Sequence, residues 1–339
     1  MENERKKHIL LLTTGGTIAS APSEQGLAPA MSGQGLLHRM EPITDSYRIT
    51  VQEILYLDSS NIQPEEWRMI ARSVYSARGQ YDGIVITHGT DTMAYTASVL
   101  SFMLEGIDLP VVVTGSQLPL THPLSDALDN LRCALAMAAS GRPGVFVAFN
   151  RKIILGTRAV KVRTMGFDAF ESVNCPPVGR IDSQGLILED RLLPPGGRAC
   201  RLHERLCVDT FLLKLTPGLN PDIFDMLRTM RYRGIVIEAF GAGGLHYIHR
   251  DLVSRLRQVT QAGIAVVACS QCLYERSDFS LYETGKRALK EGIIPAYDMT
   301  TEAAVTKLMW ALGQTDDMEE IRAIFARSYA GEITLEGQI

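Results

Sequence analysis

The sequence predicts an α/β protein of two domains, with a larger, mostly parallel N-terminal sheet flanked by helices and a smaller C-terminal parallel α/β domain. Short apolar runs, typical of strands buried on both faces, alternate with segments whose apolar residues recur every three to four positions. This alternation implies parallel strands joined by right-handed crossovers. The length, 339 residues, is also sufficient for two domains.

The elements expected in the N-terminal domain follow one another as strand and helix. Strands are expected at 8–12, 49–57, 83–87, 111–114 and 145–149, and helices at 64–78, 91–104 and 125–139. Pro64 stands near the start of the first of these helices, a position that favours proline. Trp67, Ile70 and Val74 then fall on one face, as expected for a helix that packs on a sheet.

A change of composition near Pro176 and Pro177 marks the end of the first domain. From there to about Leu206 the chain carries Pro-Pro-Gly-Gly at 194–197 and scattered charges, which is typical of a linker. We expect an N-terminal domain over 1–185, a linker over 186–208 and a C-terminal domain over 209–339. The last should hold strands at 211–215, 234–239 and 264–269, and helices from about 221 and at 250–261, 283–290, 301–312 and 318–328.

Composition and charge narrow the range of functions. The net charge is −4 without a long basic run, so nucleic acid and anionic membrane are not expected as partners. No apolar run is long enough to cross a bilayer, and the charged N-terminus lacks the apolar core of a signal peptide, which favours a cytoplasmic protein. The six cysteines are expected as reduced thiols, and Cys269-Ser-Gln-Cys272 lacks the second ligand pair of a zinc site.

Two short segments carry the clearest chemical signal. Thr13-Thr14-Gly15-Gly16-Thr17-Ile18 and His88-Gly89-Thr90-Asp91-Thr92-Met93 each follow a buried strand, and each places hydroxyls at its carboxyl end, where open α/β sheets bind ligands. Glycines there allow a ligand to approach the backbone closely. The pattern favours hydroxyl nucleophiles. By themselves, however, Thr17 is also consistent with a turn threonine, and Thr90 and Asp91 with a helix cap.

The same two segments resemble the signatures of bacterial-type L-asparaginases and glutaminase-asparaginases. The resemblance extends over nearly the whole chain. Segments similar to the cytoplasmic type I branch are Asp58-Ser59-Ser60, Ser101-Phe102-Met103-Leu104-Glu105, Thr114-Gly115-Ser116-Gln117, Gly166-Phe167-Asp168-Ala169-Phe170 and Asp298-Met299-Thr300-Thr301-Glu302-Ala303.

The resemblance implies a role for each matching residue. Thr17 corresponds to the nucleophile on a flexible loop, and Thr90 faces it across the substrate. Lys161, which lies between two valines, corresponds to the lysine that activates Thr90, and Asp91 to the aspartate that bonds this lysine and the substrate amine. A lysine in a closed site loses hydration, which suits it to exchange protons, although the local sequence alone favours a solvated lysine on a strand edge.

Further substrate contacts follow from the same resemblance. Ser59 corresponds to the serine that holds the substrate α-carboxylate, with Ser60 beside it, and Ser116 is another candidate contact. Leu27 stands where many members carry a loop tyrosine. Tyr282 matches a type I tyrosine that would replace it, or is a half-buried aromatic at a helix start.

Other departures bear on binding and regulation. Gly244 stands where many members have asparagine, so one contact to the substrate amine is expected to be missing. Some type I members carry a second, activating asparagine site. Cys272 matches a cysteine there, but Glu238 replaces an arginine and Val160 a threonine. A glutamate repels a carboxylate that an arginine would bind, so we expect hyperbolic kinetics.

The resemblance implies hydrolysis of L-asparagine to L-aspartate and ammonia through a covalent acyl-threonine, without metal or organic cofactor, in a homodimer or homotetramer. Three alternatives remain. One is a broader glutaminase-asparaginase, because one methylene gives only about 1–3 kcal/mol of discrimination. Another is the asparaginase-like subunit of a tRNA amidotransferase, which carries an extra N-terminal domain, whereas the strand before Thr17 begins near His8. The third is a non-catalytic amino-acid sensor, which would be expected to lose Thr17, Thr90 or Lys161.

Overall fold

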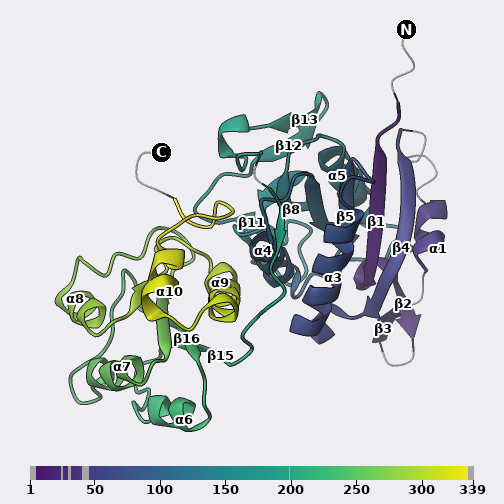
Figure 1. The fold of residues 1–339 in the computed structure, drawn as a ribbon. Helices are drawn as coiled ribbons and strands as arrows, with labels where there is room; N and C mark the ends of the chain where they lie inside the picture. The colour runs from purple at the N-terminus through teal and green to yellow at the C-terminus, as the bar shows by residue number, and fades with distance from the viewer. Residues whose placement is uncertain (1–4, 24–25, 30–31, 40–45, 198, 335–339) are drawn as a thin grey trace. The chain divides into compact units, whose positions relative to one another are not determined.

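The computed structural model describes residues 5–23, 26–29, 32–39, 46–197 and 199–334 (Figure 1). The chain divides into two compact units, Met1–Ser172 with Pro176–Glu204, and Val173–Cys175 with Arg205–Ile339. The division is therefore not one point in the sequence, because three residues before Pro176 belong to the second unit.

The N-terminal unit is built on an eight-stranded sheet of order β13-β12-β9-β8-β7-β5-β1-β4. Its parallel part consists of β4 (Arg48–Leu57), β1 (His8–Gly15), β5 (Gly83–Thr87), β7 (Pro110–Thr114) and β8 (Gly144–Phe149). Apart from the edge strand β4, these strands have apolar centres that are almost completely buried, as expected for a sheet covered on both faces. The predicted mostly parallel sheet is thus confirmed.

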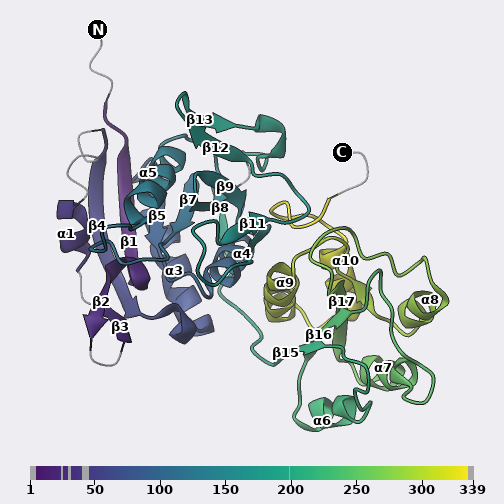
Figure 2. The same cartoon turned by 180° about the vertical axis from the view of Figure 1, so that it is seen from behind.

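Helices cover both faces of this sheet. Helices α3 (Pro64–Ala77) and α4 (Met93–Met103) pack against each other on one face in Figure 1, and α5 (Ala127–Ala138) covers the other face in Figure 2. The α3 stripe predicted from Trp67, Ile70 and Val74 is buried. A short helix, α1 (Gly33–Arg39), contacts β4 at the sheet edge.

The segment after β8 adds strands that the sequence does not predict. Strands β9 (Lys152–Leu155), β12 (Gly179–Asp182) and β13 (Gly185–Leu188) extend the sheet in antiparallel fashion. Between them, β10 (Ala159–Lys161) and β11 (Phe170–Ser172) form a hairpin. Two small pairs complete the unit: β2 (Ser20–Ser23) with β3 (Gly26–Pro29), and β6 (Leu104–Glu105) with β14 (Arg201–Leu202).

The segment that we expect as a linker, 186–208, is largely structured. It holds most of β13, the 3-10 helix η3 (Asp190–Leu192) and β14, and its residues up to Glu204 belong to the N-terminal unit. The C-terminal part of this segment is attached to the first unit by the pairing of β14 with β6, in which Leu202 lies opposite Leu104.

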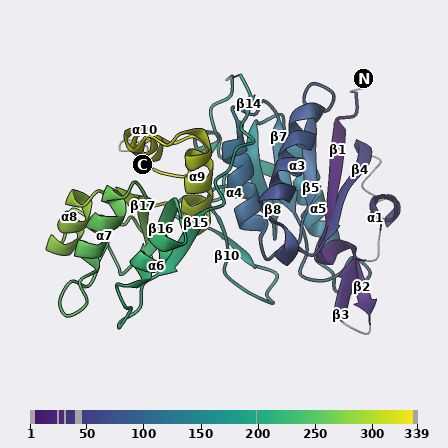
Figure 3. The same ribbon diagram turned by 60° about the horizontal axis from the view of Figure 1, so that its bottom comes forward.

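The C-terminal unit contains a smaller, wholly parallel sheet, as predicted. Strands β15 (Thr210–Lys214), β16 (Gly234–Ala239), β17 (Ala265–Ser270) and β18 (Ile294–Pro295) lie in this order. Figure 3 shows α6 (Ile223–Thr229), α7 (Leu252–Gln261) and α8 (Glu283–Lys290) on one side, and α9 (Thr301–Gln314) with α10 (Met318–Phe325) on the other. In the described ranges of the chain, no helix is long and apolar enough to cross a membrane.

Candidate active site

The two glycine-containing loops meet at one edge of the large sheet. Strands β1 and β5 are parallel neighbours with Thr13 opposite Thr87, so the loops that follow them emerge side by side. Gly16 has a φ of +81°, and a Cβ atom on it would lie 2.4 Å from the Gly89 nitrogen. Only glycine permits so close an approach of the two backbones. The half-buried Thr17 follows and begins the 3-10 helix η1 (Thr17–Ala19).

Ser59 supports the second loop from the end of β4. It begins the 3-10 helix η2 (Ser59–Asn61), is 2% exposed, and its Oγ would lie 2.5 Å from a Cβ on Gly89. The Asp91 N–H donates to Ser59 Oγ at 3.3 Å, and Thr92 Oγ1 donates to the Ser59 carbonyl at 2.7 Å. The Ser59 hydroxyl accepts this N–H bond, which leaves its own proton for another acceptor.

Lys161 joins the two polar side chains of the second loop. Its Nζ donates to Thr90 Oγ1 at 2.8 Å and to Asp91 Oδ1 at 2.6 Å. The Lys161 side chain is 18% exposed and that of Asp91 is 62% exposed. Lys161 ends β10, where it pairs with the buried Phe170 of β11. The hairpin therefore presents the ammonium group to the loop from a fixed backbone position.

Gln117, which the sequence does not single out, also contacts Thr90. Thr90 Oγ1 donates to Gln117 Oε1 at 3.2 Å. Gln117 Nε2 donates to the carbonyls of Thr164 and Gly166, each at 3.1 Å. The only sequence signal for this residue is its place at the end of the Thr114–Gln117 segment.

His88 lies beneath the same loop and is fully buried. Trp67 Nε1 can only donate, and it donates to Thr96 Oγ1 at 2.9 Å. The Gly89 carbonyl can only accept, so His88 Nδ1 carries the proton and donates to it at 2.7 Å, and in the neutral ring Nε2 accepts from Thr96 Oγ1 at 2.9 Å. Burial lowers the pKa of His88 to about 4, so the ring is neutral near pH 7. Sequence reasoning does not identify this network.

The remaining predicted residues lie in different surroundings. Ser60 is exposed, and its Oγ donates to Asp58 at 2.5 Å. Ser116 is 1% exposed, and its hydroxyl donates to the Leu118 carbonyl at 2.6 Å. Tyr282 belongs to the C-terminal unit, where it precedes α8 and is 63% exposed. The side chain of Leu27 lies outside the described part.

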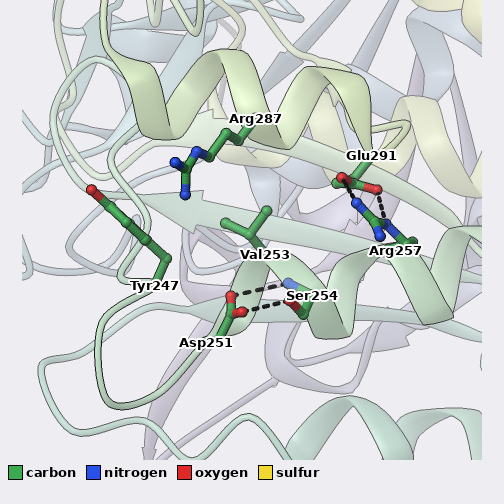
Figure 4. A pocket seen from close by; sticks show the side chains of 7 residues that line it. All are labelled: Tyr247, Asp251, Val253, Ser254, Arg257, Arg287 and Glu291. Atoms are coloured by element: carbon green, nitrogen blue, oxygen red, sulfur yellow. Dashed lines mark hydrogen bonds and ion pairs between the residues drawn. The ribbon is translucent and has the colours of Figure 1, made fainter.

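A pocket in the C-terminal unit has a different character (Figure 4). It lies between α7 and α8 and is lined by Tyr247, Asp251, Val253, Ser254, Arg257, Arg287 and Glu291. Its charged groups already have protein partners: Arg257 pairs with Glu291 at 2.5 Å, Arg287 with Glu283 at 2.7 Å, and Asp251 accepts from Ser254. Of these contacts, the Arg257–Glu291 pair joins α7 to the end of α8, and the pocket contains none of the predicted catalytic residues.

Comparison with known proteins places the chain in a family. Residues 8–193 match the family described as Asparaginase, N-terminal, and residues 209–325 match the Glutaminase/Asparaginase C-terminal domain. The chain is 47% identical over 331 residues to an L-asparaginase of Thermococcus kodakarensis, which covers 96% of this chain and 99% of that protein. It is 37% identical to a glutamyl-tRNA(Gln) amidotransferase subunit of the same organism, over 96% of this chain and 76% of that protein.

Solved structures agree with this assignment. The thermostable L-asparaginase from Thermococcus kodakarensis has a TM-score of 0.91 and 46% identity, covering 97% of this chain and 100% of its own. L-asparaginase I from Vibrio cholerae has a TM-score of 0.86 and 31% identity, covering 98% of this chain and 100% of its own. With both domains matched and the two signature loops in contact, the chain belongs to the asparaginase/glutaminase family of amidohydrolases.

Proposed function

We propose that this chain is an L-asparaginase that hydrolyses the side-chain amide of L-asparagine to L-aspartate and ammonia through a threonine nucleophile. The observation that carries the proposal is the contact of Lys161 Nζ with both Thr90 Oγ1 and Asp91 Oδ1, on a loop that packs against the backbone before Thr17. The 47% identity to the Thermococcus L-asparaginase supports the substrate.

Substrate recognition in this proposal uses the two ends of the amino acid. The Ser59 hydroxyl proton, which is not used by its bond with Asp91 N–H, is directed to the substrate α-carboxylate. Asp91 has one carboxylate oxygen on Lys161, and its exposed side chain can accept from the substrate ammonium. An amino acid held at both ends presents its side-chain amide in a fixed position, which lowers the entropic cost of reaction.

The chemical step begins at Thr17. Its Oγ forms a bond to the amide carbon, its proton passes to the amide nitrogen, and the C–N bond breaks, so that ammonia leaves and an ester of Thr17 remains. A water molecule that loses its proton towards the Thr90–Lys161 pair then hydrolyses the ester and regenerates Thr17. No metal or organic cofactor takes part in this proposal.

Backbone N–H groups of the second loop are the proposed donors to the negative carbonyl oxygen formed on attack. His88 Nδ1–H holds the Gly89 carbonyl at 2.7 Å. In a trans peptide the following N–H, that of Thr90, points in the opposite direction, away from His88. Donors fixed before the reaction stabilise the developing charge without reorganisation.

The experiment is ammonia release by the purified protein from asparagine, glutamine and an asparagine-containing peptide, measured side by side. We expect free asparagine to exceed glutamine in kcat/KM by at least about tenfold, the discrimination available from one methylene. Comparable values for the two free amides would instead assign a glutaminase-asparaginase. Hydrolysis of neither free amide would favour the function of the tRNA amidotransferase relatives, which are 37% identical or less among those compared.

Assembly and location are further parts of the proposal. We propose a homodimer or homotetramer in the cytoplasm, on the basis of the resemblance to type I enzymes. A probable cytoplasmic L-asparaginase from Campylobacter jejuni, with a TM-score of 0.81 and 27% identity, supports the location. Light scattering on the protein as it elutes from a size-exclusion column measures the number of subunits. A monomer at the concentration used for activity assays would contradict the proposed oligomer.

A further inference from the structure

We propose that Gln117 is a positioning residue whose amide carbonyl holds the Thr90 hydroxyl proton, so that the Thr90 oxygen turns a lone pair to the Lys161 ammonium group. The inference rests on the proposed asparaginase function and assigns a residue that sequence reasoning does not mark. It is argued from the direction of each hydrogen bond around Thr90.

The orientation of the Gln117 amide follows from its neighbours. One end of the amide faces the carbonyl oxygens of Thr164 and Gly166, each at 3.1 Å. Carbonyl oxygens only accept hydrogen bonds, so the NH2 group must occupy this end. The amide oxygen therefore faces Thr90 Oγ1 at 3.2 Å, and in this contact the threonine hydroxyl is the donor.

Helix α5 fixes the backbone of Gln117. The carboxylate of Asp126, which precedes α5, accepts from the Gln117 N–H at 3.0 and 3.1 Å and from the Leu118 N–H at 3.2 Å. Asn130 on α5 donates to the same carboxylate at 2.9 Å and to the Gly115 carbonyl at 3.0 Å. Gln117 is thus held at its main chain and at its amide.

The single proton of the Thr90 hydroxyl has two possible acceptors, Gln117 Oε1 and a neutral Lys161 amine. While the proton points to Gln117, Thr90 Oγ1 accepts from Lys161 Nζ at 2.8 Å, an arrangement that suits an ammonium group. For Thr90 to give up its proton, the O–H bond turns from Gln117 and breaks, and a new N–H bond forms on neutral Lys161. Gln117 therefore favours the arrangement in which Lys161 donates to Thr90, and it opposes transfer of the Thr90 proton.

The charged groups near this pair are few among the described residues. Asp91, on the loop before α4, pairs with Lys161 at 2.6 Å. On the β10–β11 hairpin, Arg163 pairs with Asp168 at 3.2 Å and with Glu171 at 2.8 Å. Asp126 faces the main chain of Gln117. None of these ion pairs includes the Gln117 amide, so a change there removes its bond to Thr90 and its two bonds to the Thr164 and Gly166 carbonyls.

The test compares the pH dependence of kcat/KM for asparagine in wild type, Gln117→Met and Gln314→Met. Gln314 is a matched control because its Nε2 also donates to two backbone carbonyls, those of Arg205 and Trp310, at 3.0 Å each. In Gln117→Met, Lys161 is the remaining side-chain partner of Thr90 Oγ1 among the residues that the structure describes. We expect the rise of kcat/KM to move to lower pH by about half to one unit, the effect of one hydrogen bond. Because the Thr90 oxygen is no longer held in its orientation towards Lys161, kcat should fall about tenfold at every pH, with little change in KM.

A second variant, Gln117→Glu, keeps an acceptor for the Thr90 proton and adds a negative charge. The rise of kcat/KM with pH should then move to higher pH, in the direction opposite to that expected for Gln117→Met. This variant tests the inference even if Gln117→Met does not fold. The Thr164 side of the loop is exposed, which lets its carbonyl turn to water. The inference would be overturned if the pH midpoint of kcat/KM were unchanged in both Gln117 variants, or if Gln314→Met moved this midpoint as Gln117→Met does. Absence of asparaginase activity in wild type would instead contradict the proposed function.

Discussion

Lys161 illustrates how far a single residue can be interpreted from sequence. Its local context, a lysine between two valines, by itself favours a solvated lysine on a strand edge. The structure places its Nζ on Thr90, a residue 71 positions away, and leaves the side chain 18% exposed. Contacts between residues so far apart leave no periodic pattern, so only the family resemblance indicated this one.

Gln117 and His88 were beyond sequence reasoning for the same physical reason. The part that Gln117 plays depends on the Thr164 and Gly166 carbonyls of another loop. His88 stands inside the second signature, but its neutral state follows from complete burial and from the bonds with Thr96 and Gly89. The sequence around His88, a histidine followed by Gly-Thr-Asp, shows neither its burial nor its hydrogen-bond partners.

His88 predicts a pH dependence of stability. Burial lowers its pKa from 6.5 in the unfolded chain to about 4 in the folded protein, and the bond to the Gly89 carbonyl and the charge of Asp58 oppose this shift. Between these values the unfolded chain binds a proton that the folded protein does not. The contribution to the free energy of unfolding is thus complete above pH 6.5 and is lost as the pH falls towards 4, by on the order of 3 kcal/mol.

Urea unfolding at pH 7 and at pH 4.5 measures this effect in wild type, His88→Gln and His122→Gln. His88→Gln should show a smaller loss of unfolding free energy between the two pH values than wild type. The exposed His122 serves as control, and His122→Gln should behave as wild type. Identical pH dependence in all three proteins would refute the assignment.

At the scale of elements, burial on both faces decides what the sequence can predict. Strands β1, β5 and β7 have continuous apolar centres, and all three were expected. The antiparallel strands β12 and β13 have four residues each and are partly exposed: β12 has no apolar run, and the three apolar residues of β13 are too few to distinguish a strand from a loop. The structured part of the expected linker escaped prediction for this reason.

The contact between the two loops predicts the effect of a methyl group on Gly16. Its φ is +81°, and an added Cβ would lie 2.4 Å from the Gly89 nitrogen. Gly79, just after α3, has a φ of +75° with no atom within 4 Å of an added Cβ, and it isolates the backbone strain. Gly79→Ala should lower the free energy of unfolding by about 1–2 kcal/mol and leave kcat unchanged.

Gly16→Ala adds to this strain a clash that separates the two loops. We expect it to lower kcat for asparagine by about 100-fold or more, as displacement of catalytic groups by about 1 Å does. Steady-state rates and thermal unfolding of both variants check the prediction. Equal kcat values in Gly16→Ala and Gly79→Ala would show that the loop contact does not position the site.

Strand β16 and helix α9 bear on regulation. Glu238 of β16 accepts from Thr301 Oγ1 of α9 at 2.7 Å and lies 3.4 Å from Lys214 Nζ. A carboxylate already satisfied in this way offers nothing to the carboxylate of a second amino acid. We expect hyperbolic dependence of rate on asparagine, measured over a wide concentration range. A Hill coefficient clearly above one that Cys272→Ala abolishes would contradict this.

For the whole molecule, the sequence was sufficient for the fold class and the family. The mostly parallel large sheet and the smaller parallel sheet followed from buried apolar runs, and the family followed from two signature loops in order. The sequence did not predict that Val173–Cys175 belong to the second unit. An assignment of three residues changes neither the composition nor the periodicity of the segment.

The central claim is that this chain hydrolyses asparagine through Thr17, with Thr90 and Lys161 acting as a unit. Its most direct test is ammonia release from asparagine by wild type, Thr17→Ala, Thr90→Val and Lys161→Met, with thermal unfolding recorded for each. We expect rapid release by wild type and a loss of at least about 1,000-fold in each variant, with unfolding transitions close to that of wild type, because residues that act together fail together. A Thr17→Ala protein that releases ammonia at a rate near that of wild type would contradict the claim.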